Sequence, residues 1–203
     1  MVYVTVNQGA ARVLRLTPST HAIAPVSDGG LLTDPAGLTM GPDGQLYVCE
    51  MSSPANNGGS GVPGRGSIVR VDPGSGSQFQ VAADSLFHGP FQIAFAGPTT
   101  IWTAQVGWLA SRHDAGFRVT NLTDGTSATP AAGNSYSIGV VANDAGTVYI
   151  SDCITNSFTC GTPYTLIVPA GPQLLLGGAL AIVPQLGTPT SGTSWGRLKA
   201  TYR

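Results

Sequence analysis

Charged residues are scarce in this sequence. Lysine, arginine, aspartate and glutamate together make up 9% of the 203 residues, and the formal net charge is −1. Because there is no basic excess to meet phosphate groups, we expect no nucleic-acid partner. The scarcity of charge does not indicate disorder, since 42% of the residues are apolar and disordered chains are poor in apolar residues. The composition therefore favours a folded domain with a sizeable core.

Long apolar segments are also missing. The longest, residues 174–184, contains Gly177 and Gly178 and is shorter than the roughly 18 residues that a membrane span requires. We therefore expect no membrane span. Residues 1–6 have neither the basic region nor the cleavage site of a signal peptide, so we expect a strand there and no signal peptide in this numbering.

Cysteine is limited to three residues. Cys153 and Cys160 lie on either side of a short polar segment, which predicts a local disulfide in an oxidising compartment and two unpaired thiols otherwise. A metal site built on them is disfavoured, because no second cysteine or histidine pair would complete a tetrahedral ligand set. Cys49 lies within a β-rich run, where a buried small side chain is expected.

Glycine and proline, in contrast, are abundant, with 28 and 15 residues. They punctuate a repeat that occupies residues 37–50 and 139–152, with a degraded copy at 92–105. Each copy is an apolar run, a turn and a second β-rich run that ends in a polar residue. Turns such as Asp43-Gly44 suit β-hairpins because glycine accepts a positive φ, so the two runs are predicted to be adjacent antiparallel strands.

A second pair of β-rich runs follows the hairpin, as at residues 66–72 and 78–81. Two hairpins per repeat make a four-stranded antiparallel unit, which is the blade of a β-propeller. The predicted fold is therefore all-β, with about four blades. Their limits are residues 1–26 with 178–185, then 27–83, 84–132 and 133–177.

The two ends of the chain complement each other in this scheme. Residues 2–4 match the second strand of a blade, whereas residues 179–184 look like a first strand. We therefore predict a propeller domain over 1–186, closed by pairing of 178–185 with 1–7, and a linker and C-terminal tail over 187–203. The alternative is part of a larger ring, whose open edges would favour self-association.

Two segments, 34–48 and 66–73, resemble repeats of the NHL, SMP-30/gluconolactonase and virginiamycin B lyase-like propellers. The resemblance implies short four-stranded blades, usually six or seven in number, so four blades depart from the family pattern. It also implies that any chemistry lies at the central channel, with carboxylates and an Asn around a divalent cation in the lactonases and His and Glu in the lyases. Neither set can be matched here residue by residue, and many relatives are non-catalytic scaffolds.

Polar residues end the second strand of three repeats, at Glu50, Gln105 and Asp152. Equivalent positions in a propeller lie at equivalent places around the axis, and these oxygen ligands would suit Ca²⁺ or Mg²⁺. The alternative is that they only cap turn amides. His88, in a Gly-Pro loop, is the candidate general base, with a structural role as its alternative. Aromatic residues recur one position into the second strand and predict packing between blades: Tyr3, Tyr47, Trp102 and Tyr149.

These patterns favour a non-catalytic binding or scaffold module, secreted or associated with the cell envelope, whose partner is a protein, a glycan or a small molecule. The alternative is a divalent-cation-dependent lactonase or lyase that uses Glu50, Asp152, Gln105 and His88 at the channel. A third interpretation is an incomplete propeller that assembles with a second copy of itself.

Overall fold

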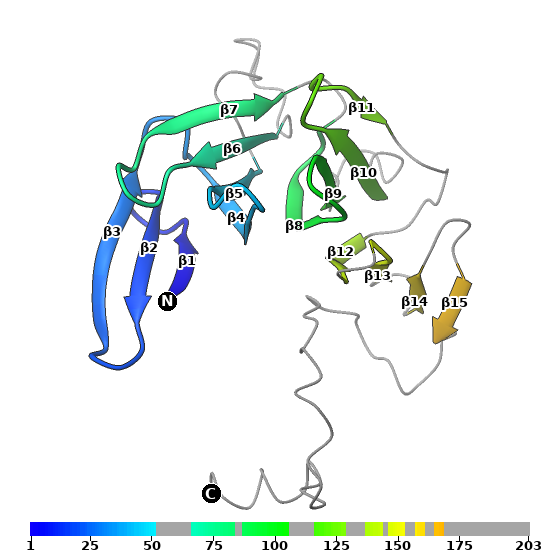
Figure 1. The fold of residues 1–203 in the computed structure, drawn as a ribbon, viewed down its shortest axis with the longest axis horizontal. Helices are drawn as coiled ribbons and strands as arrows, with labels where there is room; N and C mark the ends of the chain where they lie inside the picture. The colour runs from blue at the N-terminus through cyan, green and yellow to red at the C-terminus, as the bar shows by residue number, and fades with distance from the viewer. Residues whose placement is uncertain are drawn as a thin grey trace, which may run out of the picture.

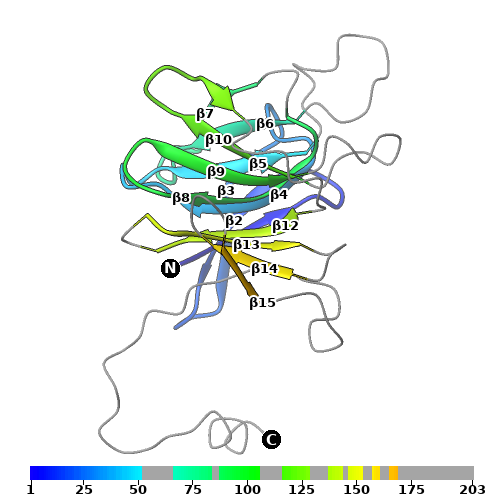
Figure 2. The same ribbon diagram turned by 90° about the vertical axis from the view of Figure 1, so that its right-hand side faces the viewer.

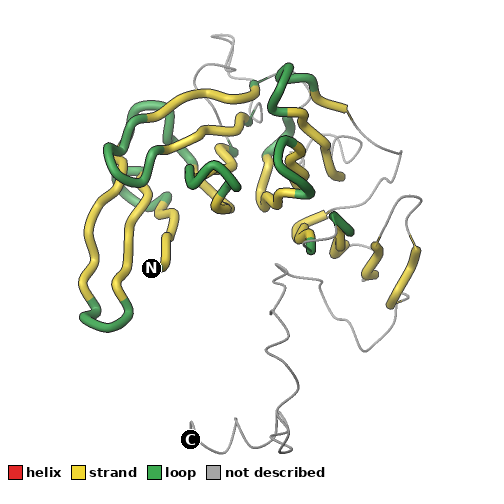
Figure 3. Tube along the Cα trace, viewed as in Figure 1, coloured by secondary structure: helices red, strands yellow, loops and turns green. Residues whose placement is uncertain are grey.

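The computed structural model describes residues 1–51, 66–83, 87–105, 116–128, 137–143, 146–152, 157–160 and 165–168. Figure 3 shows only strands and loops in these ranges. Within them, no helix has the length and apolar character needed to cross a membrane.

The strands form four antiparallel sheets that follow one another along the chain, here called blades 1 to 4 (Figure 1). Blade 1 contains β1 (Val2–Val6), β2 (Arg12–Thr17) and β3 (Ala22–Asp28). Blade 2 contains β4 (Pro35–Met40), β5 (Leu46–Glu50), β6 (Ser67–Val71) and β7 (Gln78–Ala82). Blade 3 contains β8 (Pro90–Phe95), β9 (Thr100–Gln105), β10 (Gly116–Asn121) and β11 (Ser127–Ala128). Blade 4 contains β12 (Ser137–Ala142), β13 (Val148–Asp152), β14 (Ser157–Cys160) and β15 (Thr165–Val168).

The first hairpin of each complete blade has the same register. Leu38 pairs with Val48, Ile93 with Thr103 and Val140 with Ile150, so the three sequence copies are structurally equivalent. Gly44 and Gly146 adopt φ values of 76° and 77° in the hairpin turns, a conformation that favours glycine. The predicted all-β fold of four-stranded antiparallel propeller blades is confirmed.

Blade 1 differs from the others because it has three described strands. Its first strand, β1, pairs with β2 in the way that β5 pairs with β6, which confirms that residues 2–6 form the second strand of a blade. Residues 178–185, predicted to supply the first strand, lie outside the described residues, as do 187–203. Ring closure and the domain limits therefore stay predictions.

The blades stand side by side in an arc, with β1, β4, β8 and β12 on its concave side (Figure 1). Figure 2 shows that the strands of blades 3 and 4 cross the picture and stack as successive sheets. The core lies between the blades, in three clusters. In the first cluster, Val13 and Leu32 pack against blade 2. In the second, Phe87 and Ile93 pack against blade 2 from the side of blade 3. In the third, Phe117 of blade 3 packs against blade 4.

The repeated aromatic residues lie in these clusters. Tyr3 packs between blades 1 and 2, Tyr47 between blades 2 and 3, and Trp102 between blades 3 and 4. The ring of Tyr47 meets that of Phe95 edge-on, with 4.9 Å between the centroids. Cys49 is fully buried in the second cluster, and burial raises the pKa of its thiol, as expected for an inert core cysteine.

Candidate functional site

Glu50, the last residue of β5, directs its carboxylate to the loop that precedes β4. One oxygen accepts a hydrogen bond from the backbone amide of Thr33 at 2.9 Å. The other accepts from the Thr33 hydroxyl at 3.1 Å and from the backbone amide of Asp34. The side chain is 0% exposed, and this burial raises its pKa to about 7 in spite of the three donors. Glu50 therefore anchors the entry of blade 2.

Gln105 does the same in blade 3. It ends β9 and is 3% exposed, and its side-chain carbonyl accepts a hydrogen bond from the backbone amide of His88 at 2.6 Å. Pro35 opposes Glu50 in the sheet register, and Pro90 opposes Gln105 in the same way. The structure thus brings two candidate residues, Gln105 and His88, together through the His88 backbone.

Asp152 ends β13 opposite Ser137, the position that corresponds to Glu50 and Gln105. Its side chain lies outside the part of the chain that the structure describes. Among the described residues, no three His, Cys, Asp or Glu side chains form a group that could hold a metal ion. The Ca²⁺ or Mg²⁺ site of Glu50, Gln105 and Asp152 stays a prediction, and so does His88 as a general base.

The predicted Cys153–Cys160 disulfide is likewise untested. Cys153 lies outside the described residues, whereas Cys160 ends β14 and pairs with Tyr149 in the sheet.

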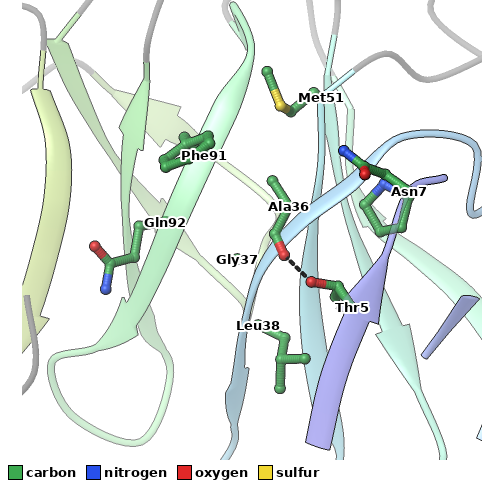
Figure 4. A pocket seen from close by; sticks show the side chains of 9 residues that line it. Thr5, Asn7, Ala36, Gly37, Leu38, Met51, Phe91 and Gln92 are labelled. Carbon is green, nitrogen blue, oxygen red and sulfur yellow. Dashed lines mark hydrogen bonds between the residues drawn. The ribbon is translucent and has the colours of Figure 1, made fainter. Parts of the chain in front are cut away.

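A hollow that sequence reasoning missed lies where the inner strands of three blades meet (Figure 4). Its volume is about 360 Å³, and β1, β4 and β8 supply most of its walls. The lining residues are Thr5, Asn7, Pro35, Ala36, Gly37, Leu38, Met51, Phe91 and Gln92. The size is that of a small-molecule site, which typically measures about 300–1,000 Å³.

Close packing of the inner strands shapes this hollow. A Cβ added to Gly37 would lie 2.5 Å from the carbonyl oxygen of Phe91, so the backbones of β4 and β8 approach closely because Gly37 has no side chain. On the other side, the Thr5 hydroxyl donates a hydrogen bond to the carbonyl of Ala36 (Figure 4). Both β4 and β8 carry a register shift here, between Pro35 and Leu38 and between Pro90 and Gln92.

The lining is uncharged. Phe91 is 38% exposed and Met51 is half-buried, so the walls include accessible apolar surface. Hydrogen-bonding groups come from Asn7, which donates to Asp34 at 3.5 Å, and from Gln92, whose carbonyl accepts from the Val140 amide at 3.2 Å. Such a site can take an uncharged molecule that presents an apolar face and polar edges.

One sequence signal could have pointed to this hollow. At the bulge where blade 2 has Ala36 and Gly37, blade 3 has the larger pair Phe91 and Gln92. A large, partly exposed aromatic residue where blade 2 has an alanine is more informative than the polar strand ends.

The four repeated blades define a β-propeller, and comparison with solved structures agrees. A chain from the crystal structure of a nidogen–laminin complex matches with a TM-score of 0.65 and 17% identity, over 87% of this chain and 62% of that one. Virginiamycin B lyase from Staphylococcus aureus matches with a TM-score of 0.58 and 16% identity, over 88% and 58%. The periplasmic gluconolactonase PpgL of Pseudomonas aeruginosa matches with a TM-score of 0.60 and 17% identity, over 84% and 55%.

These likenesses confirm the resemblance to lyase-like and gluconolactonase-like propellers at the level of the fold. The chain spans 55% to 62% of the length of these three solved chains. No protein-family model matches the sequence, and no curated protein is significantly similar to it.

Proposed function

We propose that this chain is a binding module, and that the hollow between β1, β4 and β8 takes up a neutral ligand such as a sugar ring. The observation that carries the proposal is the lining: the partly exposed Phe91 and the amides of Asn7 and Gln92 line the hollow, and no charged side chain does. An aromatic face packs on the apolar face of a sugar, and amides bond its hydroxyls.

The use of the strand-end residues supports binding over catalysis. Both carboxylate oxygens of Glu50 and the carbonyl oxygen of Gln105 already accept hydrogen bonds from the loops before β4 and β8. Their role in holding those loops accounts for their burial. The match to a chain of the nidogen–laminin complex is a precedent for binding on this fold. The periplasmic location of one lactonase match supports a secreted or cell-envelope location for this chain.

The second candidate is a divalent-cation-dependent lactonase or lyase acting at the channel. One observation favours it: burial raises the pKa of Glu50 to about 7, and carboxyl groups that titrate near neutrality are enriched at catalytic sites. The lyase and gluconolactonase matches are precedents for enzymes on the same fold.

A titration with neutral sugars tests the binding proposal. We would measure binding of glucose, galactose and N-acetylglucosamine by ligand-observed NMR, with glucuronic acid as the charged counterpart. The expected result is binding of at least one neutral sugar, weaker binding of the uronic acid, and loss of both with Phe91→Ala. The control is Phe79→Ala, which removes an exposed aromatic residue from β7, away from the hollow.

Two results would overturn the proposal: no binding of any neutral sugar, or binding that Phe91→Ala leaves unchanged. Lactone hydrolysis that depends on added Ca²⁺ or Mg²⁺ and is lost in Glu50→Gln would favour the enzyme instead.

A further inference from the structure

One face of blade 1 is an uncovered apolar surface. The sheet register places Val2, Leu16 and Ile23 side by side across β1, β2 and β3, and places Val4 beside Leu14 in the next row. Val2 is 44% exposed, Val4 43% and Ile23 66%. Alternate residues of the same strands, such as Tyr3 and Val13, point the other way and pack on blade 2. Both faces of this sheet are therefore apolar, and one of them is open.

The equivalent face of blade 2 is covered by the preceding blade. Val2, Val4, Leu14 and Leu16 correspond by register to a second set of four residues, each 0% exposed: Leu46, Val48, Val69 and Val71. Blade 1 covers that set with Tyr3 and Val13. The same is true two blades further, where Trp102 and Phe117 of blade 3 cover Val148 and Ile150 of blade 4. The open face of blade 1 therefore has the construction of a face that receives a preceding blade.

The chain also carries the complementary face, at the other end of the arc. Tyr149 of blade 4 occupies the register position of Tyr3, Tyr47 and Trp102, and each of those three aromatic residues packs between its own blade and the following one. Figure 1 shows blades 1 and 4 at opposite ends of an open arc. One molecule thus presents the two halves of a blade–blade interface, pointing in opposite directions around the ring.

We propose that the open face of blade 1 binds blade 4 of a second copy of this chain. If the second copy is related to the first by a two-fold axis along the channel, its blade 1 binds the first copy's blade 4 in the same way. A head-to-tail interface of this kind closes instead of propagating when the rotation is a half-turn. Each joint would bury the row of Val2, Val4, Leu14 and Leu16, as the internal joint between blades 1 and 2 buries its counterpart.

The open edge of β1 borders the same face. Among the described strands β1 pairs only with β2, so its other edge presents backbone groups that can pair with another chain. Docking of the second copy would bury the apolar row and shield the amides at this edge from solvent. The low charge of the chain, with a net of −1, leaves little electrostatic repulsion between copies.

Light scattering after size-exclusion chromatography tests this proposal on the full chain. The expected result is a particle of twice the mass of one chain at micromolar concentration. Val4→Glu would place a charge in the joint, and we expect it to raise the dimer dissociation constant by roughly 100-fold or more. The matched control is Met40→Glu, since Met40 is 44% exposed but lies at the hairpin end of blade 2; it should leave the dimer intact.

Hydrogen exchange gives a second readout that needs no variant. Amides of residues 2–6 should gain protection as the wild-type concentration rises from nanomolar to micromolar, while those of β6 should not change. A monomer at all concentrations, as expected if residues 178–185 close the ring within one chain, would overturn the proposal. A dimer that Val4→Glu does not weaken, or a trimer or larger species, would overturn it too.

Discussion

Gln105 accepts a hydrogen bond from the backbone amide of His88 at 2.6 Å, and Glu50 accepts one from the amide of Thr33 one blade earlier. The two side chains occupy the same position in the repeat, yet one is a neutral amide and the other a carboxyl group. Blades 2 and 3 are thereby each held to their entry loops by the residue that ends the second strand. The effect of a carboxyl group at this position can therefore be compared with that of a neutral amide in two equivalent blades.

Exchange of Glu50 and Gln105 should transfer a pH dependence of the free energy of unfolding from blade 2 to blade 3. Burial raises the pKa of Glu50 from its ordinary 4.5 to about 7, so the folded protein keeps a proton that the unfolded chain releases. The free energy of unfolding should fall as the pH rises from about 4.5 to about 7, and then level off. Glu50→Gln should remove this slope, and Gln105→Glu should add a second one of the same sign.

Urea unfolding at pH 4.5, 5.5, 6.5 and 7.5 measures both slopes against the wild type. Glu50→Gln should also lose stability by a similar amount at every pH, because its amide nitrogen cannot accept a hydrogen bond and leaves at least one of the donors of Thr33 and Asp34 without its acceptor. An unchanged slope in Glu50→Gln would mean that another group carries the pH dependence.

Gly37→Ala should destabilise the fold because the added Cβ would lie 2.5 Å from the Phe91 carbonyl oxygen and 2.8 Å from the Gln92 Cα. Backbone atoms cannot rotate away, so β4 and β8 must separate. We expect a loss of about 1–3 kcal/mol, the usual cost of overpacking. The control is Gly74→Ala, whose Cβ would meet only a carboxylate oxygen of Asp72, at 3.3 Å. Equal unfolding midpoints for the two variants would contradict the close approach of the strands.

Trp102→Ala should cost about 3–5 kcal/mol, as expected for a large buried aromatic residue. The ring stacks on Phe117 at a centroid distance of 5.8 Å and packs in the cluster between blades 3 and 4. Trp102→Phe keeps an aromatic ring and should cost much less. Chemical denaturation monitored by circular dichroism compares the two, and similar losses would show that the ring face is not the stabilising feature.

Gln78 joins blade 2 to the segment that links it to blade 1. Its carbonyl accepts from the Leu31 amide at 2.6 Å, and its amide donates to the Ser27 hydroxyl at 2.8 Å and the Gly29 carbonyl at 2.9 Å. Gln78→Ala should lower the free energy of unfolding by about 2–3 kcal/mol, at roughly 1 kcal/mol for each bond. Gln8→Ala, at an exposed glutamine, serves as control. A loss no larger than that of the control would contradict the role of these bonds.

The blades could be predicted from the sequence because their signals are local. Leu38, Ile93 and Val140 recur at a fixed distance before a second apolar run, and Gly44 and Gly146 mark the turns. A hairpin needs no information from elsewhere in the chain. The prediction that residues 2–6 form the second strand of a blade followed from the same comparison of copies.

The hollow could not be predicted in this way because it belongs to no single repeat. Thr5, Gly37 and Phe91 come from three blades, and only the packing of blade on blade brings them together. The direction of a side chain at a strand end is also set by the fold. From the sequence alone, Glu50 and Gln105 could be either metal ligands or residues that cap turn amides. In the structure, their side-chain oxygens accept hydrogen bonds from the loops before β4 and β8.

The aromatic residues at the three described joints all reach from one blade toward the next in chain order. Because N-terminal segments fold first during synthesis, blade 1 can present Tyr3 and Val13 to blade 2 as blade 2 is made. Each later blade is then added to a completed surface, and most contacts are made within one repeat or with its neighbour. The direction of these joints therefore allows the blades to assemble in the order in which they are translated.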